Sequence, residues 1–238
     1  MTYFAHHHLN TDAAVMVTGS HNPPEYNGFK MVLNKHSFFA DEIQNLQLLT
    51  TLKDISTGQG KLNNIDISNE YVKNNLKNIK FNKKMKIAWD IANGSMGTVI
   101  DSFTNQLRSA EHVVINKEVD GTFPNHHPDP TVPKNMEQLV QTVVSNSCDI
   151  GLGFDGDGDR VGVIDNKGNE IFSDKIGLLI ARNLSFSHNN SKFIVDVKST
   201  GLYSSDEVLN KNQCKTIYWK TGHSHIKRKV YNDKALAG

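Results

Sequence analysis

Short apolar runs rich in β-branched residues alternate along this chain with segments of helical periodicity, and this alternation limits the possible folds more than any other feature. It is most regular in the middle of the chain, where elements are expected in this order: a strand over residues 85–92, a helix ending near Ala110, a strand over 113–116, a helix over 136–145 and a strand over 149–154. A βαβαβ order is typical of a parallel sheet with crossover helices. We therefore predict an α/β fold.

The N-terminal part of the chain shows the same alternation less regularly. We expect a buried strand over residues 14–18 and a second strand over residues 29–33, separated by the Pro23-Pro24 pair, which interrupts regular structure. A helix follows, because four apolar residues fall on one helical face: Ile43, Leu46, Leu49 and Leu52. The Asn- and Lys-rich stretch of residues 63–84 predicts a partly exposed helix and a connection.

The C-terminal part repeats the alternation of strands and helices. Its expected elements are a strand over 161–165, a helix from residue 173, a strand over 193–197, a helix near 202–209, a strand over 216–219 and a helix from residue 223. On the last helix, the basic run Lys227-Arg228-Lys229 has no interleaved aromatic residues, so it is expected to form a solvated face and not a nucleic-acid patch.

These three parts predict α/β domains in tandem, with parallel or mixed sheets. At roughly 150 residues per domain, a chain of 238 residues holds between one and two domains of average size. The change in composition before residue 85 places a domain boundary near residue 80. The family resemblance described below further implies a partial domain over residues 1–80, a complete one over 81–169 and a second partial one over 170–238.

Charge and composition exclude several classes of protein. A formal net charge of +1 produces no field that would attract nucleic acid, so nucleic acid is not expected as a partner. The chain has no apolar stretch of about 18 residues and no secretory signal, so we expect neither membrane insertion nor export. Cys148 and Cys214 lie far apart and lack metal-ligand spacing, which favours a cytoplasmic protein over a disulfide framework or a zinc module.

The loop between the strands expected over residues 149–154 and 161–165 is acidic and rich in glycine, with the sequence Asp155-Gly156-Asp157-Gly158-Asp159-Arg160. Its three carboxylates repel one another unless a cation lies among them, and the glycines let the backbone turn so that all three face one point. Oxygen ligands favour a hard ion, so Mg²⁺ is the first choice, with Mn²⁺ or Ca²⁺ as alternatives. An EF-hand loop is excluded because its sixth and twelfth positions would be Arg160 and Asn166.

A second loop places Ser20 directly after the first expected strand, between Gly19 and the double proline. Glycine and proline keep this serine out of regular structure, on an exposed and rigid loop. Such a serine acts as a nucleophile when a neighbouring group activates it, and His21 and Lys30 are the candidates. The alternative is a polar turn in which the hydroxyl of Ser20 only caps the backbone.

A third candidate site lies where the strand expected over residues 216–219 leads into the last helix. The free N–H groups and the dipole at a helix start favour a bound anion. Lys220 and His223 add positive charge and hydrogen-bond donors at this point. Ordinary capping of the helix is the alternative interpretation.

Together, these motifs resemble the α-D-phosphohexomutase family, and within it the phosphomannomutase/phosphoglucomutase branch. The resemblance extends over nearly the whole chain and includes the segments 118–130 and 196–198. It implies tandem α/β domains of the phosphohexomutase type, the first with the serine loop and the second with the metal loop. It also implies an enzyme that interconverts hexose 1-phosphate and hexose 6-phosphate through a phosphoserine and a bisphosphorylated intermediate.

The resemblance further implies a role for each candidate residue. Ser20 would carry the phosphoryl group, and Mg²⁺ would be held by a phosphate oxygen on Ser20 together with Asp155, Asp157 and Asp159. The other residues implied at the reacting group are Arg160 for the phosphoryl oxygens, Lys30 as general acid/base and His21 as support for the serine loop. The hexose phosphate, a mannose or glucose 1- or 6-phosphate, would be bound by Lys198, Lys220 and His223.

Some parts of the family pattern have no counterpart in this sequence. Family members carry a first strand and an arginine-bearing loop before the serine loop, and a sugar-selecting loop and a fourth domain after the position of Gly238. We therefore expect a portion of a mutase truncated at both ends, with little or no turnover of its own. Two alternatives are a metal-dependent phosphatase that uses the same aspartates, and a non-catalytic Mg²⁺-binding fragment that pairs with a separately encoded C-terminal chain.

Overall fold

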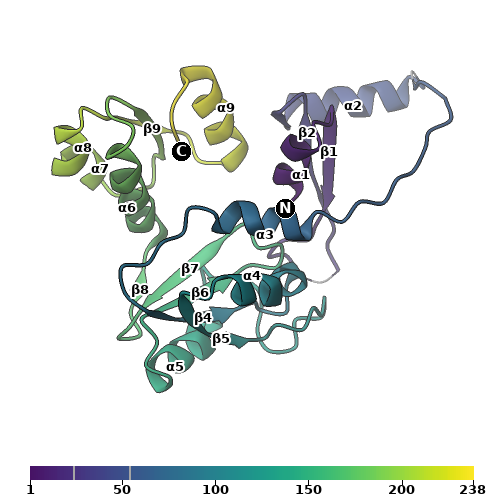
Figure 1. Ribbon diagram of the computed structural model, residues 1–238. Helices are drawn as coiled ribbons and strands as arrows, with labels where there is room; N and C mark the ends of the chain where they lie inside the picture. Colours follow the sequence, from purple (N-terminus) through teal and green to yellow (C-terminus); the bar gives the residue numbers. More distant parts are fainter. Residues whose placement is uncertain (24, 54) are drawn as a thin grey trace.

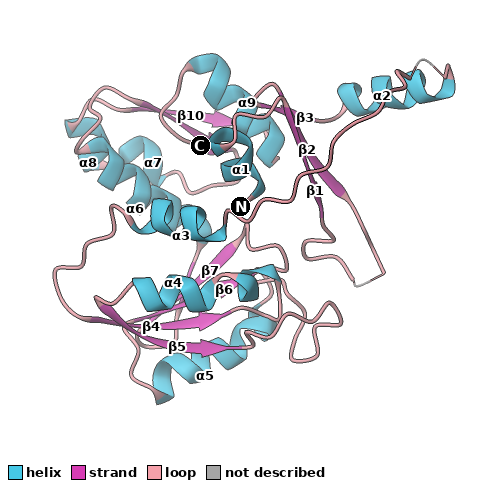
Figure 2. Ribbon diagram, turned by 45° about the vertical axis from the view of Figure 1, so that its right-hand side comes forward, coloured by secondary structure: helices cyan, strands magenta, loops and turns pink. Residues whose placement is uncertain are grey.

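The computed structural model describes residues 1–23, 25–53 and 55–238, so Pro24, the second proline of the expected break, lies outside the described residues. Across the described residues the strands form sheets of three, five and two strands, and helices pack around them (Figures 1 and 2). The predicted α/β fold is confirmed. Within the same residues, no helix combines the length and hydrophobicity needed to cross a membrane.

The central sheet is mixed. Its strands lie in the order β5 (Ala110–Ile115), β4 (Met85–Asp90), β6 (Ile150–Phe154), β7 (Val161–Asp165) and β8 (Glu170–Ile171). Strand β4 is parallel to β5 and β6, whereas β7 is antiparallel to both of its neighbours. The acidic loop therefore connects the two strands of an antiparallel hairpin, β6 and β7. The short strand β8 was not expected from the sequence.

Helices cover both faces of this sheet. The helices α3 (Ser68–Leu76) and α4 (Ile100–Gln106) lie on one face, and α5 (Glu137–Ser145) lies on the other (Figure 1). A 3-10 turn precedes α4 at Ser95–Thr98 and another precedes α5 at Pro133–Met136. The helix expected to reach Ala110 ends at Gln106, because Ala110 already pairs with Met85 as the first residue of β5.

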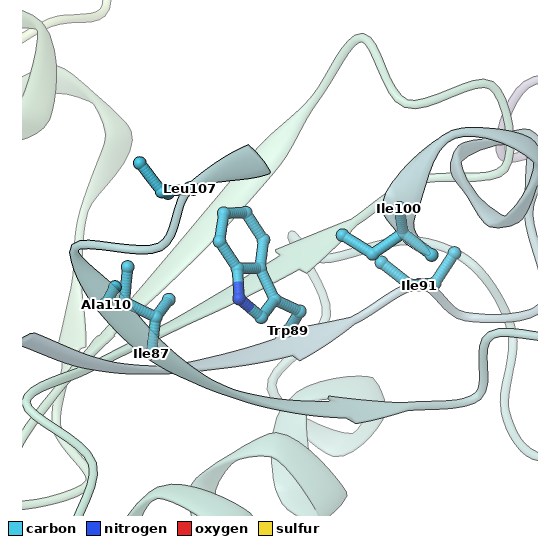
Figure 3. Packing of buried hydrophobic residues seen from close by; sticks show 6 residues of the cluster. All are labelled: Ile87, Trp89, Ile91, Ile100, Leu107 and Ala110. Atoms are coloured by element: carbon cyan, nitrogen blue, oxygen red, sulfur yellow. The ribbon is translucent and has the colours of Figure 1, made fainter. Parts of the chain in front are cut away.

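The core of the central unit has two halves, because successive side chains of β4 point to opposite faces of the sheet. One half lies under α4 and consists of Ile87, Trp89, Ile91, Ile100, Leu107 and Ala110 (Figure 3). The other lies against α5 and consists of Ala88, Met136, Leu139, Val143, Cys148 and Ile164. Truncating a fully buried residue such as Leu139 to alanine costs about 2–5 kcal/mol, so these halves form a rigid base for the acidic loop.

The N-terminal unit is an antiparallel sheet of β1 (Ala13–Val17), β2 (Phe29–Leu33) and β3 (His36–Phe38), flanked by α1 (Thr2–His8) and α2 (Asp41–Thr51). Strands β1 and β2 and helix α2 were expected, whereas α1 and β3 were not. The expectation that the first strand is buried is wrong, since Val15 and Val17 are 58% and 65% exposed. The apolar side of α2 lies next to this face of the sheet, around a groove lined by Val15, Leu46 and Leu49.

The C-terminal unit contains the parallel pair β9 (Lys192–Asp196) and β10 (Lys215–Trp219), with α6 (Ser173–Ser185) before it and α9 (His223–Asp233) after it. The single helix expected near residues 202–209 is two short helices, α7 (Leu202–Ser205) and α8 (Glu207–Lys211). Asp206 separates them, because its carboxylate accepts the backbone N–H groups of Val208 and Leu209 and so begins a new helix.

The expectation that the basic run of residues 227–229 forms a solvated face holds only in part, because Lys227 is exposed but the run also contacts the N-terminal unit. The ammonium group of Lys227 lies 3.6 Å from the ring centre of Tyr3 in α1, and the guanidinium of Arg228 lies 3.0 Å from the carboxylate of Glu42 in α2. The aromatic and acidic partners come from the other end of the sequence, so no local pattern could indicate them. Helix α9 thereby joins the C-terminal unit to the N-terminal one (Figure 2). The domain limits expected after residues 80 and 169 stay a prediction.

Candidate functional site

The loop after β1 holds Ser20 clear of the sheet. The backbone N–H of Thr18 donates to Gly28 O (2.9 Å) and closes the base of the loop, and the Thr18 hydroxyl accepts the N–H of Ser20 (2.8 Å). Ser20 itself is left-handed, with φ of 51°, a conformation that residues other than glycine rarely adopt. Strain of this kind persists only where the surrounding contacts impose it, and it is common at functional sites.

The acidic loop between β6 and β7 is folded by its own hydrogen bonds. The carboxylate of Asp155, which is fully buried, accepts the backbone N–H groups of Asp159 (3.0 Å) and Arg160 (3.1 Å). Gly158 makes the turn possible with φ of +72°. As a result, Asp155, Asp157 and Asp159 each offer an oxygen within 4.8 Å of the others, as the spacing predicts.

The serine loop and the acidic loop are in direct contact, although 135 residues separate them in sequence. The hydroxyl of Ser20 donates to Asp155 Oδ2 (2.9 Å), and it lies 3.4 Å from Asp157 Oδ1. A Cβ atom on Gly156 would overlap the carbonyl oxygen of Ser20, so only glycine permits this approach. The nucleophile and the metal-binding residues expected from the sequence thus form one site.

The ammonium group of Lys30 bridges two of the three carboxylates. It lies 2.7 Å from Asp157 Oδ2 and 2.6 Å from Asp159 Oδ2. The position of this positive group shows that the cluster accommodates a cation, and the three aspartates can hold a metal ion through oxygen atoms alone. The fit of the donor set to a divalent ion is therefore good.

Burial and charge change the protonation behaviour of this cluster. Burial, together with the negative charges of its two neighbours, raises the pKa of Asp155. Burial acts in the same direction on Asp157, but hydrogen bonds from Lys30 and Thr18 outweigh it and lower the pKa of that carboxyl. For Lys30, burial is outweighed by the bonds to Asp157 and Asp159, so the pKa of its ammonium group is raised.

A hollow of about 520 Å³ opens beside Ser20, and its lining includes the carboxylate of Asp159 and four residues that can donate hydrogen bonds to an anion. The four donors are His21, Lys30, Arg160 and His223. His21 Nδ1 lies 3.4 Å from the Ser20 hydroxyl, and His223 Nε2, from the first residue of α9, lies 3.9 Å from Asp159 Oδ2. An anion bound in this hollow would meet donors from all three units.

Two of the expected sugar-binding residues lie elsewhere. Lys198 and Lys220 follow the neighbouring parallel strands β9 and β10, so both are at the same edge of the C-terminal sheet, and both side chains are exposed. Neither is among the described residues that line the hollow beside Ser20. The structure therefore places His223 in the lining of the hollow beside Ser20 and leaves these two lysines outside that lining.

Thr18 is a residue of the site that the sequence did not single out. Its hydroxyl donates to Asp157 Oδ2 (2.7 Å) while accepting the N–H of Ser20, so it links the two loops. The feature of the sequence that could have indicated Thr18 is its position directly after β1, two residues before the serine.

Comparisons with known proteins agree with this geometry. Three family models, described as alpha/beta/alpha domains I, II and III of phosphoglucomutase/phosphomannomutase, match residues 1–54, 69–168 and 172–238. The chain belongs to the phosphoglucomutase/phosphomannomutase family. The resemblance seen in the sequence motifs is thereby confirmed.

Individual members of this family are similar over almost the whole chain. The phosphomannomutase/phosphoglucomutase of Pseudomonas putida is 40% identical over 236 residues, which are 98% of this chain and 50% of that protein. The phosphoglucomutase of a Neisseria meningitidis serogroup A strain is 40% identical over 239 residues, 99% of this chain and 51% of that protein. The chain therefore spans about half the length of these relatives.

The fold of a solved family member is also similar. The crystal structure of a phosphoglucomutase/phosphomannomutase family protein from Burkholderia thailandensis superposes with a TM-score of 0.89 at 36% identity. The match covers 96% of this chain and 49% of that one. The family's tandem α/β architecture is thus present in the three sheets described above.

Proposed function

We propose that this chain carries the phosphoryl-transfer site of a phosphohexomutase, which interconverts hexose 1-phosphate and hexose 6-phosphate. The observation that supports this most strongly is the contact between the Ser20 hydroxyl and Asp155 Oδ2, 2.9 Å, within a cluster of three aspartates. A serine beside a cation site is suited to carry a phosphoryl group, because the charge of the group is neutralised where it is bound.

Mg²⁺ is the proposed ion, held by Asp155, Asp157, Asp159 and an oxygen on Ser20. When bound, it supplies charge neutralisation at the phosphoryl group. In one half-reaction the bond from phosphorus to Ser20 Oγ breaks while a bond to a sugar hydroxyl oxygen forms. The sugar hydroxyl gives its proton to a base, and the departing Ser20 oxygen takes up a proton from an acid, which restores the serine hydroxyl.

The chain's own residues would assist this transfer in different ways. Arg160 offers a planar fork of donors to the phosphoryl oxygens, and His21 supports the serine loop. Lys30 is the proposed general acid/base. Its bonds to Asp157 and Asp159 raise its pKa and so favour the protonated ammonium form, which can accept a proton only after it has donated its own.

The substrate proposed for this site is a hexose phosphate, a mannose or glucose 1- or 6-phosphate. His223 lines the hollow beside Ser20, and Lys198 and Lys220 are proposed to contact more distant parts of the sugar phosphate from the edge of the β9–β10 sheet. The relatives named above are mutases, which does not favour the phosphatase alternative. Since the chain spans about half of their length, we expect the 238 residues alone to convert little mannose 1-phosphate to mannose 6-phosphate. We propose that a C-terminal complementing chain would restore this activity.

Phosphorylation of Ser20 tests the proposal. Purified protein incubated with a hexose 1,6-bisphosphate and Mg²⁺ should gain one phosphate, which peptide mass spectrometry should map to Ser20. Ser20→Ala should abolish the gain, and the matched control Ser187→Ala, at an exposed serine of the C-terminal unit, should retain it. Phosphate at another residue, or none at all, would contradict the proposed role of Ser20.

A further inference from the structure

The segment of residues 118–130, part of the family resemblance, has no role in the proposed function, yet it encloses a turn next to the acidic loop. The turn follows β4, and Asn93 lies at its centre. The side-chain amide of Asn93 donates to Glu118 O (2.8 Å) and its oxygen accepts Asn125 Nδ2 (2.8 Å), while its backbone O accepts the N–H of Asp120 (3.0 Å). Three points of the segment are thus fastened to one residue of the turn.

The same turn also contacts the acidic loop directly, at Gly156. Ala92 and Asn93 are left-handed, with φ of 49° and 57°, which directs the chain back towards the loop. The N–H of Ser95 donates to Gly156 O (2.9 Å), and a Cβ atom on Gly94 would lie only 2.7 Å from the same oxygen. Gly156 is therefore held between this turn on one side and the backbone of Ser20 on the other.

A buried ion pair anchors the turn and the segment to each other. Asp90, the last residue of β4, is 1% exposed and accepts the N–H of Ala92 (3.0 Å), Asn116 Nδ2 (2.9 Å) and His126 Nε2 (2.9 Å). The other ring nitrogen of His126 faces the carbonyl oxygen of His127 at 3.0 Å. Both partners of the imidazole are acceptors, so the ring is best satisfied as an imidazolium with two N–H donors.

We propose that Asp90 and His126 are positioning residues for the metal centre. Their ion pair fixes the turn after β4, the turn fixes Gly156, and Gly156 sets how closely Ser20 approaches Asp155 and Asp157. Neither residue touches the reacting group, so both act through the backbone of the acidic loop. The inference rests on the proposed function in one respect, since it takes the aspartate cluster to be a divalent-cation site. Outer residues of this kind control metal affinity because they hold the ligands in place.

The proposal is tested by measuring how tightly the 238-residue chain binds Mn²⁺. The electron paramagnetic resonance signal of free Mn²⁺ reports the fraction that is not bound. His126→Gln, which cannot supply two N–H groups from a ring, should weaken Mn²⁺ binding by roughly 10-fold. Asn93→Gly should weaken it in the same direction, because glycine adopts the left-handed turn without strain but loses both side-chain hydrogen bonds.

Two control variants separate positioning from stability. His127→Gln changes the adjacent, exposed histidine, whose backbone oxygen faces His126 Nδ1. The substitution keeps that oxygen, so it should leave Mn²⁺ affinity unchanged. Leu209→Ala opens the remote core of the C-terminal unit, so it should lower the Tm but not the Mn²⁺ affinity of the folded protein. All affinities are measured at a temperature at which circular dichroism shows each variant to be folded.

Each outcome decides between the two proposals. Wild-type affinity in folded His126→Gln and Asn93→Gly would overturn the positioning role while the metal site itself stands. Failure of the unaltered chain to bind Mn²⁺ would overturn the metal site and, with it, the positioning role. Loss of affinity in His126→Gln alone, with Asn93→Gly unchanged, would overturn the route through the turn.

Discussion

At the scale of single residues, the site depends on a glycine, Gly156, whose lack of a side chain lets the serine loop approach the acidic loop. Besides the hydrogen bonds between the serine loop and the acidic loop, the backbone oxygen of Ser20 lies where a Cβ atom on Gly156 would be, so a methyl group has no room there. The alternation of glycine and aspartate in the sequence predicted that the carboxylates would converge. It did not predict that one of these glycines would be the contact point for a loop 136 positions earlier, because that requirement arises only when the two units pack.

Substituting Gly156 by alanine tests this contact. The added methyl group would overlap a backbone oxygen that has no freedom to move aside, so we expect the free energy of unfolding to fall by roughly 2 kcal/mol. Gly121→Ala is the matched control, because a Cβ atom there would have nothing within 4 Å. Urea unfolding followed by tryptophan fluorescence measures both, and equal midpoints for the two variants would show that the loops can separate without cost.

At the scale of elements, the features that position the site are the ends of strands. Strand β1 delivers Ser20, the β6–β7 hairpin delivers the aspartates, and β4 ends in Asp90 and the turn that supports them. Strands β4, β6 and β7 of the central sheet were predictable because their apolar runs are largely buried, whereas the two-residue strand β8 has no such run. The split at Asp206 was not, because a carboxylate that caps a new helix overrides an otherwise continuous helical pattern.

The ion pair between Asp90, at the end of β4, and His126 should make the stability of the protein depend on pH. Burial opposes the charge on His126, but its hydrogen bonds to Asp90 and to the His127 carbonyl outweigh it and raise the pKa above the ordinary value of 6.5. A raised folded-state pKa means that the stabilisation is complete below pH 6.5 and is lost as the pH rises through the folded value. The free energy of unfolding, measured by urea titration at several pH values from 6 to about 9, should therefore fall more steeply in wild type than in His126→Gln. His127→Gln should follow the wild-type curve, and identical curves for all three proteins would contradict a charged His126.

At the scale of the whole molecule, helix α9 connects units from opposite ends of the chain. Its first residue, His223, lies 3.9 Å from Asp159 Oδ2, while Arg228 donates to Ser37 O (2.7 Å) and pairs with Glu42. The ring of Phe39 lies 4.6 Å under the same guanidinium. These contacts hold the start of α9 over the hollow beside Ser20, so the geometry of the site depends on the packing of distant units.

A double-mutant cycle over Arg228→Ala and Glu42→Ala measures this connection. Both side chains are 38% exposed, so solvent screens the pair, and we expect a coupling free energy of about 0.5 kcal/mol from chemical unfolding. The cycle over Lys84→Ala and Glu111→Ala, an exposed pair between the residue before β4 and strand β5, is the matched control and should show no measurable coupling. Hydrogen exchange at β3 should rise in Arg228→Ala but not in Lys84→Ala. Unchanged exchange would mean that α9 does not hold the N-terminal sheet.

By itself, the sequence determined the α/β class, most strands of the central sheet, the convergence of Asp155, Asp157 and Asp159, and the family. These follow from local periodicity, from short-range backbone geometry and from motifs that are contiguous in the chain. Only the tertiary structure decided how closely Ser20 approaches Asp155, that Lys30 bridges two carboxylates, that Lys198 and Lys220 lie outside the hollow, and that Lys227 and Arg228 contact the N-terminal unit. The physical reason is the same in each case: these contacts join residues far apart in sequence, and their energies exist only once three separately formed sheets have packed together.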